Sequence, residues 1–456
     1  MKQASAHINR GGKHFMSTSY ILIAFALCIL LMIVSISKWK IHPVTSILVV
    51  AIILAISIGT PWQKIESTIN AGLASTLKSI AIVIVLGCIM GKILEETGAA
   101  VRITKATVNL FGTKHVIWAI ALASAILGIP IWADTVVILL IPIVSNLALK
   151  TNRSMISFGT ALYMGALVTA SLIPPTPGPV AAAALLHLPL GSAILWGVVV
   201  SVPSVIAATL YCITLKEPLQ PKEEYLRSAS AIDDTTLPGI GKSLLPIILP
   251  LALIFLNTLF NTMMPKTTLA NVFAFVGSPL AALLAGCIFA LLLTGREWRS
   301  KKVQNDWVED ALRSSAMPIM VTAMGGALAA FIKDAGIAKI IGETVVAFNV
   351  PGILIPIIIA ALIHIVTGSN ALGVMTAAAL VEPMLETIGV SPLAAFLCCG
   401  TGALMFKHAN SSGFWVTVSM SNMDIRQGIK GVSVASTIAG GTGAFLTIIL
   451  HYAGLI

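Results

Sequence analysis

Long apolar segments recur along the whole 456-residue chain. A helix needs roughly 20 residues to cross the hydrocarbon core of a membrane, and most of these segments approach or exceed that length. Only 10% of the residues are charged and the mean hydropathy is +0.97, so the chain has too little polar surface to cover a soluble globule. We therefore expect an all-α polytopic membrane protein, embedded in a lipid bilayer, with about 10–12 transmembrane helices. The apolar segments are residues 20–37, 42–60, 79–91, 115–149, 190–215, 244–264, 269–294, 350–366 and 432–456.

The formal charge of +10 does not indicate a nucleic-acid partner, because the basic residues are scattered among short loops. Lys and Arg in such loops usually mark the cytoplasmic side of a membrane. The densest basic cluster lies within residues 296–313, which we place in the cytoplasm. Basic residues on both flanks of the first apolar segment leave the side of the N-terminus open.

The sequence contains no pattern typical of an enzyme or a bound cofactor. The six cysteines sit in apolar surroundings without metal-ligand spacing, which is typical of packing residues. A nucleotide-binding glycine loop and a nucleophile elbow are both absent from the sequence. We expect a protein that is not an enzyme and has no cofactor.

The stretch SLIPPTPGPVAAAALL, residues 171–186, breaks an apolar region with four prolines. Proline lacks a backbone N–H and clashes with the preceding turn, so this stretch cannot continue a helix. Irregular backbone at membrane depth is tolerated where protein or a water-filled cavity surrounds it. We expect a re-entrant hairpin with its tip near 174–179. The alternative is an ordinary loop in water, against which stands the absence of charge between Arg153 and Lys216.

A weak internal repeat relates the two parts of the chain. Residues from Gly91 resemble those from Ala329, an offset that sets the break at 128–130 opposite 366–368. PPTPG at 174–178 then falls opposite ANSSG at 409–413. In duplicated transporters, interrupted segments at corresponding positions mark the binding site, although chance similarity between apolar segments is the alternative. The predicted organisation is an N-terminal extension (1–19), a first half (20–215), an aqueous linker (216–243) and a second half (244–456) with a hairpin tip near 409–413.

Four stretches together resemble the gluconate permease family. They are GIPIWADTVVILLIPI, LIPPTPGPVAAA, IHIVTGSNALGVMTAA and FKHANSSGFWV, and the similarity runs from about residue 20 to the C-terminus. The resemblance implies a proton-coupled symporter for sugar acids in a bacterial inner membrane. It also implies the fold of the ion-transporter superfamily, in which two inverted repeats each contain a re-entrant hairpin. Such proteins have a scaffold domain and a transport domain. The resemblance further implies elevator-type movement of the transport domain and a homodimer.

The chain departs from the family pattern at several positions. Family members often have His where this chain has Ala170 and Thr176, and the second hairpin commonly reads Ser-His-Val-Asn-Asp where this chain has residues 407–411. Gaining Lys407 and losing an Asp changes the charge of the region by two. The departures leave open which acid is carried, and keep a sodium-coupled carboxylate carrier as the alternative function.

Asp134 is the most informative ionisable residue, because charged groups in apolar segments are costly and often functional. It follows the break at 128–130 and opens a helical pattern, where a helix N-terminus stabilises an anion. We expect Asp134 to bind substrate and to carry the coupling proton, the alternative being a helix cap. His408, which can change protonation near neutral pH, is a second candidate for proton coupling and substrate binding.

Uncharged polar groups at the breaks suit a polyhydroxy acid, because hydroxyl and amide groups can bond several substrate hydroxyls. Gly178 would permit close approach of the backbone, and Lys407 would offer a counter-charge for a carboxylate. His364 and His187 are more typical of packing histidines. The remaining expected substrate-binding residues are Thr176, Thr367, Ser369, Asn370, Asn410 and Ser411.

Overall fold

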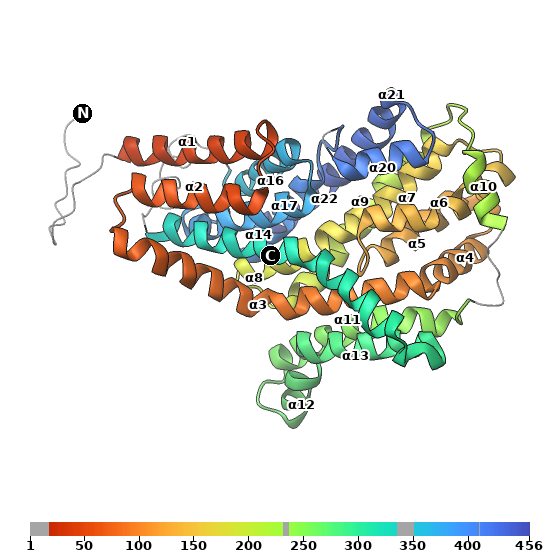
Figure 1. The fold of residues 1–456 in the computed structure, drawn as a ribbon, viewed down its shortest axis with the longest axis horizontal. Helices are drawn as coiled ribbons and strands as arrows, with labels where there is room; N and C mark the ends of the chain where they lie inside the picture. Colours follow the sequence, from red (N-terminus) through yellow and green to blue (C-terminus); the bar gives the residue numbers. More distant parts are fainter. Residues whose placement is uncertain (1–17, 231–236, 335–350, 410) are drawn as a thin grey trace.

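The computed structural model describes residues 18–230, 237–334, 351–409 and 411–456, and within these ranges every regular element is a helix (Figure 1). The first half contains α1 Thr18–Ser37, α2 Pro43–Ser57, α3 Trp62–Glu96, α4 Ala99–Phe111, η1 Thr113–His115, α5 Val116–Leu127, α6 Ala133–Lys150, α7 Met155–Leu172, α8 Pro177–Leu185 and α9 Leu190–Thr214. The expected linker contains α10 Glu223–Ser230. The second half contains α11 Ile240–Met263, α12 Thr268–Val276, α13 Pro279–Leu291, η2 Leu292–Arg299, η3 Lys302–Trp307, α14 Val308–Asp334, α16 Leu354–Thr367, α17 Asn370–Val381, η4 Glu382–Met384, α18 Leu385–Ile388, α19 Pro392–Leu404, α20 Ser412–Met420, α21 Ile425–Gly428, η5 Ile429–Ser433 and α22 Val434–Tyr452.

The helical content agrees with a chain that crosses a membrane many times. In the described part of the chain, nine helices are long and apolar enough to span a bilayer. The count rises to ten if α4 and the helix after it, bent by 110°, form one broken span. Shorter apolar helices such as α2, α16 and α19 lie among them. The all-α polytopic architecture is therefore as expected.

The two longest helices, α3 and α14, pack along each other and join the two halves of the sequence (Figure 1). Small residues allow this close approach. A Cβ atom on Gly72 would lie 2.7 Å from the Cα atom of Ala327, and one on Gly326 would lie 2.0 Å from Oγ1 of Thr76. Without a strong hydrophobic drive between helices in lipid, such close backbone packing is a main source of association.

Four interruptions break the helices of the two halves, at 128–132, 173–176, 368–369 and 405–411. Two of them have a clear local chemical cause. Gly368 ends α16 with φ 71°, a left-handed conformation that glycine adopts without strain, and Ser369 caps α17 by accepting a hydrogen bond from Leu372 N at 3.3 Å. Pro177 occupies the first position of α8, where a missing N–H costs nothing.

The prolines near 174–179 interrupt a span and do not reverse the chain. Helices α7 and α8 together form one 31-residue candidate span, Met155–Leu185, with the two helices on either side of the break (Figure 1). This differs from the hairpin tip expected there, because α8 continues beyond the end of α7 and packs mainly against α17 and α3. Helices α19 and α20 both pack on α7. Gly400 of α19 lies against Ser171 near the end of α7, and Ser421 after α20 lies against Gly159 near its start, so the break around 409–413 also continues the chain.

The chain folds back at the other two breaks. Helix α16 packs against α17, so the chain turns at Gly368 and Ser369. Helices α5 and α6 contact each other and both pack against α7. Proline alone does not decide whether a broken segment reverses, because the packing partners of the second half-helix settle its direction.

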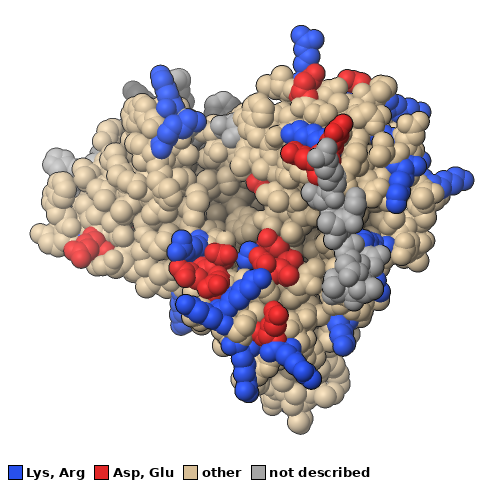
Figure 2. Space-filling model, turned by 45° about the vertical axis from the view of Figure 1, so that its right-hand side comes forward, with Lys and Arg blue, Asp and Glu red and all other residues tan. Residues whose placement is uncertain are grey.

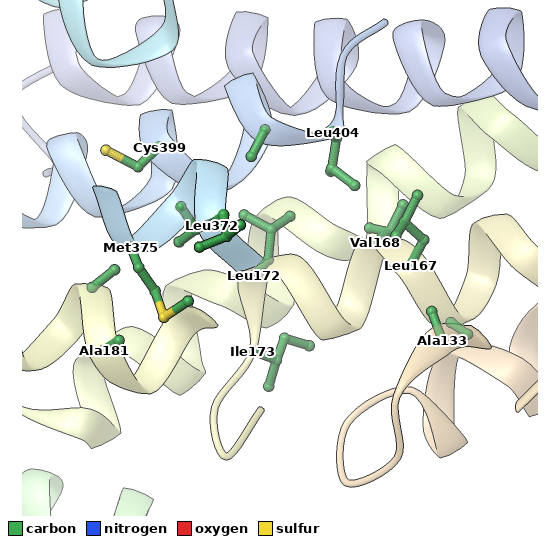
Figure 3. Close-up of a cluster of buried hydrophobic side chains, with 14 of the residues drawn as sticks. Ala133, Leu167, Val168, Leu172, Ile173, Ala181, Leu372, Met375, Cys399 and Leu404 are labelled. Atoms are coloured by element: carbon green, nitrogen blue, oxygen red, sulfur yellow. The ribbon is translucent and has the colours of Figure 1, made fainter. Parts of the chain in front are cut away.

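The apolar core surrounds the breaks. Figure 3 shows Leu172 and Ile173 at the end of α7 beside Leu372 and Met375 of α17, all of them buried. Fixed packing of this density holds the irregular backbone in one conformation. The proline break at 173–176 is thus surrounded by protein, which satisfies the condition for irregular backbone in an apolar region.

Candidate functional site at the helix breaks

The four breaks lie close together in space, because residues at the helix ends beside them contact one another. Asn370, which opens α17, donates from Nδ2 to Ser171 Oγ near the end of α7 at 3.4 Å. Asp134 at the start of α6 accepts a hydrogen bond from Ser412 at the start of α20 at 3.0 Å. Gly178 of α8 lies against α17, because a Cβ atom there would be 3.5 Å from the Cα atom of Ala371. Residues distant in sequence therefore build one polar region.

Four half-helices, α6, α8, α17 and α20, begin at these breaks. The first turn of a helix carries unpaired N–H groups and the positive end of the helix dipole. Such helix ends favour anions, and transporters use them to hold substrate carboxylates. The arrangement suits a negatively charged ligand.

Asp134 lies half-buried in the first turn of α6, as expected. Its carboxylate shares a narrow space with Tyr163 of α7 and Gly413 of α20. A Cβ atom on Gly413 would lie 2.0 Å from Tyr163 Oη and 2.4 Å from Asp134 Oδ1. Only glycine at position 413 leaves room for both oxygen atoms.

Lys407 is buried in the segment between α19 and α20, with 3% of its surface exposed. Its ammonium group donates a hydrogen bond to Asn370 Oδ1 and lies 5.7 Å from the centre of the Tyr163 ring. Asp134 acts on this charge electrostatically without forming an ion pair with it. The expected counter-charge for a carboxylate therefore lies among the other candidate residues.

The two histidines of this region bond to main-chain carbonyl groups. His408 Nε2 is 3.0 Å from Ile365 O, and His364 Nδ1 is 2.9 Å from Met405 O. Both contacts tie the break after α19 to helix α16. His187 lies elsewhere, exposed and 3.7 Å from Glu382, so it takes no part in the site.

Several candidate hydroxyl groups serve the backbone of their own break. Thr176 Oγ1 donates to Ala170 O at 2.9 Å and to Ile173 O at 2.8 Å. Thr367 Oγ1 donates to Ile363 O at 2.8 Å, and Ser369 is the cap described above. In this conformation these side chains shape the breaks. Asn410 lies outside the described residues.

Tyr163 and Ser171 also belong to this region, although the sequence alone did not indicate them. Tyr163 is fully buried, and neither its hydroxyl oxygen nor Ser411 Oγ meets a hydrogen-bond partner in the described part of the protein. A buried tyrosine hydroxyl usually has a partner. The available signal was a tyrosine inside the otherwise apolar stretch before the proline break.

A polar cavity of about 370 Å³ borders the first break. Trp132 and Thr135, on either side of Asp134 in sequence, line it together with Lys92, Asp310 and Arg313. Lys92 lies 2.7 Å from Glu96 and 3.7 Å from Asp310, which connects α3 to α14. Figure 2 shows charged side chains gathered beside a hollow on one face of the molecule. The cavity offers an aqueous approach to the α6 end of the site.

We expect Thr176→Val to lower the free energy of unfolding by about 1–3 kcal/mol, because it leaves two buried carbonyl groups with one hydrogen bond fewer. Thermal unfolding in detergent measures the change. The matched control is Thr262→Val, an exposed threonine whose Oγ1 donates to Thr258 O at 2.8 Å. Equal stability of the two variants would show that the Thr176 bonds contribute nothing specific to the break.

In the described residues, many apolar helices and a polar region where broken helices meet are typical of a polytopic membrane transporter. The model of the GntP family permeases matches residues 20–453. The chain belongs to this family of membrane permeases, and the expected resemblance is confirmed.

Two relatives are named as transporters of gluconate and of L-idonate. The chain is 28% identical to the high-affinity gluconate transporter of Escherichia coli strain K12 over 433 residues, 94% of this chain and 99% of the relative. It is 26% identical to the Gnt-II system L-idonate transporter of the same strain, covering 91% of this chain and 96% of the relative. A solved structure of MtrF from Neisseria gonorrhoeae, described as an antimetabolite efflux pump, matches with a TM-score of 0.63 at 15% identity, over 91% of this chain and 96% of that one. That likeness concerns the fold alone.

Proposed function

We propose that this protein is a secondary active transporter that imports gluconate-like sugar acids by proton symport across a bacterial inner membrane. Family membership and the gluconate and idonate relatives support the substrate class. The observation that carries the coupling mechanism is the position of Asp134, whose carboxylate lies beside Tyr163 and Ser412 where the breaks meet.

The charge of Asp134 would couple binding of the proton to binding of the substrate acid. Two like charges about 4 Å apart near a protein surface repel each other by roughly 4 kcal/mol. An acid bound at the breaks would meet this repulsion if Asp134 were ionised, and protonation removes it. Proton and acid then bind together, and each raises the affinity for the other. Tyr163, Lys407, His364 and His408 are the other titratable groups that face this region.

The polar groups at the breaks would recognise the hydroxyl groups of the substrate. Candidate binding groups are Asn370, Ser411, His408, Thr367 and Ser369, with Thr176 and Gly178 shaping the first proline break. Two repeated sets of broken helices, α5 to α8 and α16 to α20, would form a transport domain moving against α3 and α14. This is the inverted-repeat, elevator-type arrangement that the family resemblance implies.

Transport in proteoliposomes tests the proposal. We expect labelled gluconate to accumulate inside vesicles when a pH gradient, and not a sodium gradient, is imposed. Accumulation driven by sodium alone would favour the sodium-coupled alternative. Failure of every aldonate to be transported would contradict the proposed substrate class.

A deoxy analogue of gluconate should bind more weakly by about 1–3 kcal/mol, because a missing hydroxyl leaves a buried polar group of the site unpaired. Competition against labelled gluconate measures this difference for each hydroxyl position. The control competitor is a simple fatty acid of equal chain length, which should compete poorly. Equal competition by gluconate and the fatty acid would indicate another class of substrate.

A further inference from the structure

A buried charge without an ionic partner lies at the centre of the site. The Lys407 side chain bonds to an amide oxygen, that of Asn370, and faces the Tyr163 ring, both of which are neutral. Among the described residues Asp134 acts on it electrostatically but forms no ion pair with it. Burying a charge without an ionic partner is costly, so such a group suits a ligand of opposite charge.

Two unsatisfied hydroxyl groups lie beside this charge. Tyr163 is 0% exposed and Ser411 is 2% exposed, and their hydroxyl oxygens have no hydrogen-bond partner in the part of the chain that the structure describes. The Tyr163 hydroxyl faces the Ser411 side chain, and Asp134 lies close to it. Two hydroxyls can satisfy each other with one hydrogen bond at most, so at least one buried O–H hydrogen has no acceptor, which indicates a missing one.

The backbone adds a third feature that favours an anion. Ser411 is the residue immediately before α20, and Asn370 is the first residue of α17. The positive ends of both helices therefore face the segment that carries Lys407. A carboxylate can accept several hydrogen bonds at once, from an ammonium group, two hydroxyls and helix N–H groups.

We propose that Lys407 Nζ, Tyr163 Oη and Ser411 Oγ form the subsite that binds the carboxylate of the substrate. This inference rests on the proposed function, because it assigns one end of a sugar acid to these groups. The hydroxyl-bearing remainder of the substrate then extends from the subsite toward the polar groups at the other breaks. Lys407 makes the site selective for an acid over a neutral polyol.

Binding of gluconate and its neutral amide, gluconamide, to the full-length protein in lipid nanodiscs tests the subsite. Lys407→Met keeps the length of the side chain and removes its charge. We expect gluconate affinity to fall roughly tenfold to a hundredfold, as for a lost hydrogen bond to a charged group. Gluconamide affinity should change little, so the preference for the acid disappears. The control, Lys430→Met, removes an exposed lysine paired with Glu217 and should preserve the preference.

Tyr163→Phe is a second variant that spares the fold, because the hydroxyl that it removes faces only Ser411, which belongs to the same proposed subsite. We expect it to weaken gluconate more than gluconamide. Equal losses for both ligands in Lys407→Met, or unchanged gluconate binding in both variants, would overturn the subsite. A wild-type protein that binds neither gluconate nor gluconamide would instead contradict the proposed function, and the subsite with it.

Discussion

Asp134→Asn should abolish accumulation of gluconate driven by a pH gradient while leaving exchange of gluconate across the membrane measurable. The substitution keeps the size of the side chain and its ability to accept a hydrogen bond from Ser412, which the carboxylate accepts at 3.0 Å. It also fixes the neutral form, so the side chain can no longer bind and release a proton. Uphill transport needs that cycle, whereas exchange needs only substrate binding and movement.

Uptake assays in proteoliposomes with and without a pH gradient, followed by counterflow of labelled gluconate, measure the two activities separately. Glu217→Gln provides a control, because Glu217 pairs with Lys430 at an exposed position away from the breaks. If Asp134→Asn still concentrates gluconate with unchanged pH dependence, Asp134 is only a helix cap. The proton would then be carried by His408 or by the substrate.

Gly413→Ala should reduce transport on the order of a hundredfold or more, since small misplacements of functional groups can have effects of this size. The added Cβ atom would lie 2.0 Å from Tyr163 Oη and 2.4 Å from Asp134 Oδ1, so both groups must move. The clash pushes the start of α20 away from Asp134 at the start of α6 and from Tyr163 in α7. Initial rates of gluconate uptake measure the loss.

The matched control for this variant is Gly441→Ala in α22, where an added Cβ atom meets nothing within 4 Å. It should transport at the wild-type rate, and its greater helix propensity should slightly stabilise the protein. Both variants must be compared at equal amounts of folded protein. A Gly413→Ala variant as active as Gly441→Ala would show that transport does not need the close approach of α20 to Asp134 and Tyr163.

The sequence predicts the helical class and the importance of the breaks because both follow from strong local signals. Apolar segments of spanning length define the helices. The prolines at 174–179 cannot continue a helix, and Gly368 weakens one. The charged residue Asp134 was found because a carboxylate stands out in an apolar segment. The structure brings it together with Asn370 and Ser411 from the other half of the chain.

The direction of the chain at each break could not be predicted, because it depends on distant packing. Helix α8 continues the span of α7 because α17 and α3 offer it a surface. The direction of individual side chains could not be predicted either. Thr176 points back to the carbonyl groups of Ala170 and Ile173. Tyr163 gave little warning, since one tyrosine in an apolar helix is common in membrane proteins.

Simultaneous measurement of gluconate entry and internal acidification in proteoliposomes tests proton-coupled sugar-acid transport most directly. With an inwardly directed gluconate gradient as the only driving force, we expect gluconate entry to acidify the lumen of wild-type vesicles. The same gradient should produce no acidification in Asp134→Asn vesicles. Gluconate entry without proton movement in the wild-type protein would contradict proton symport.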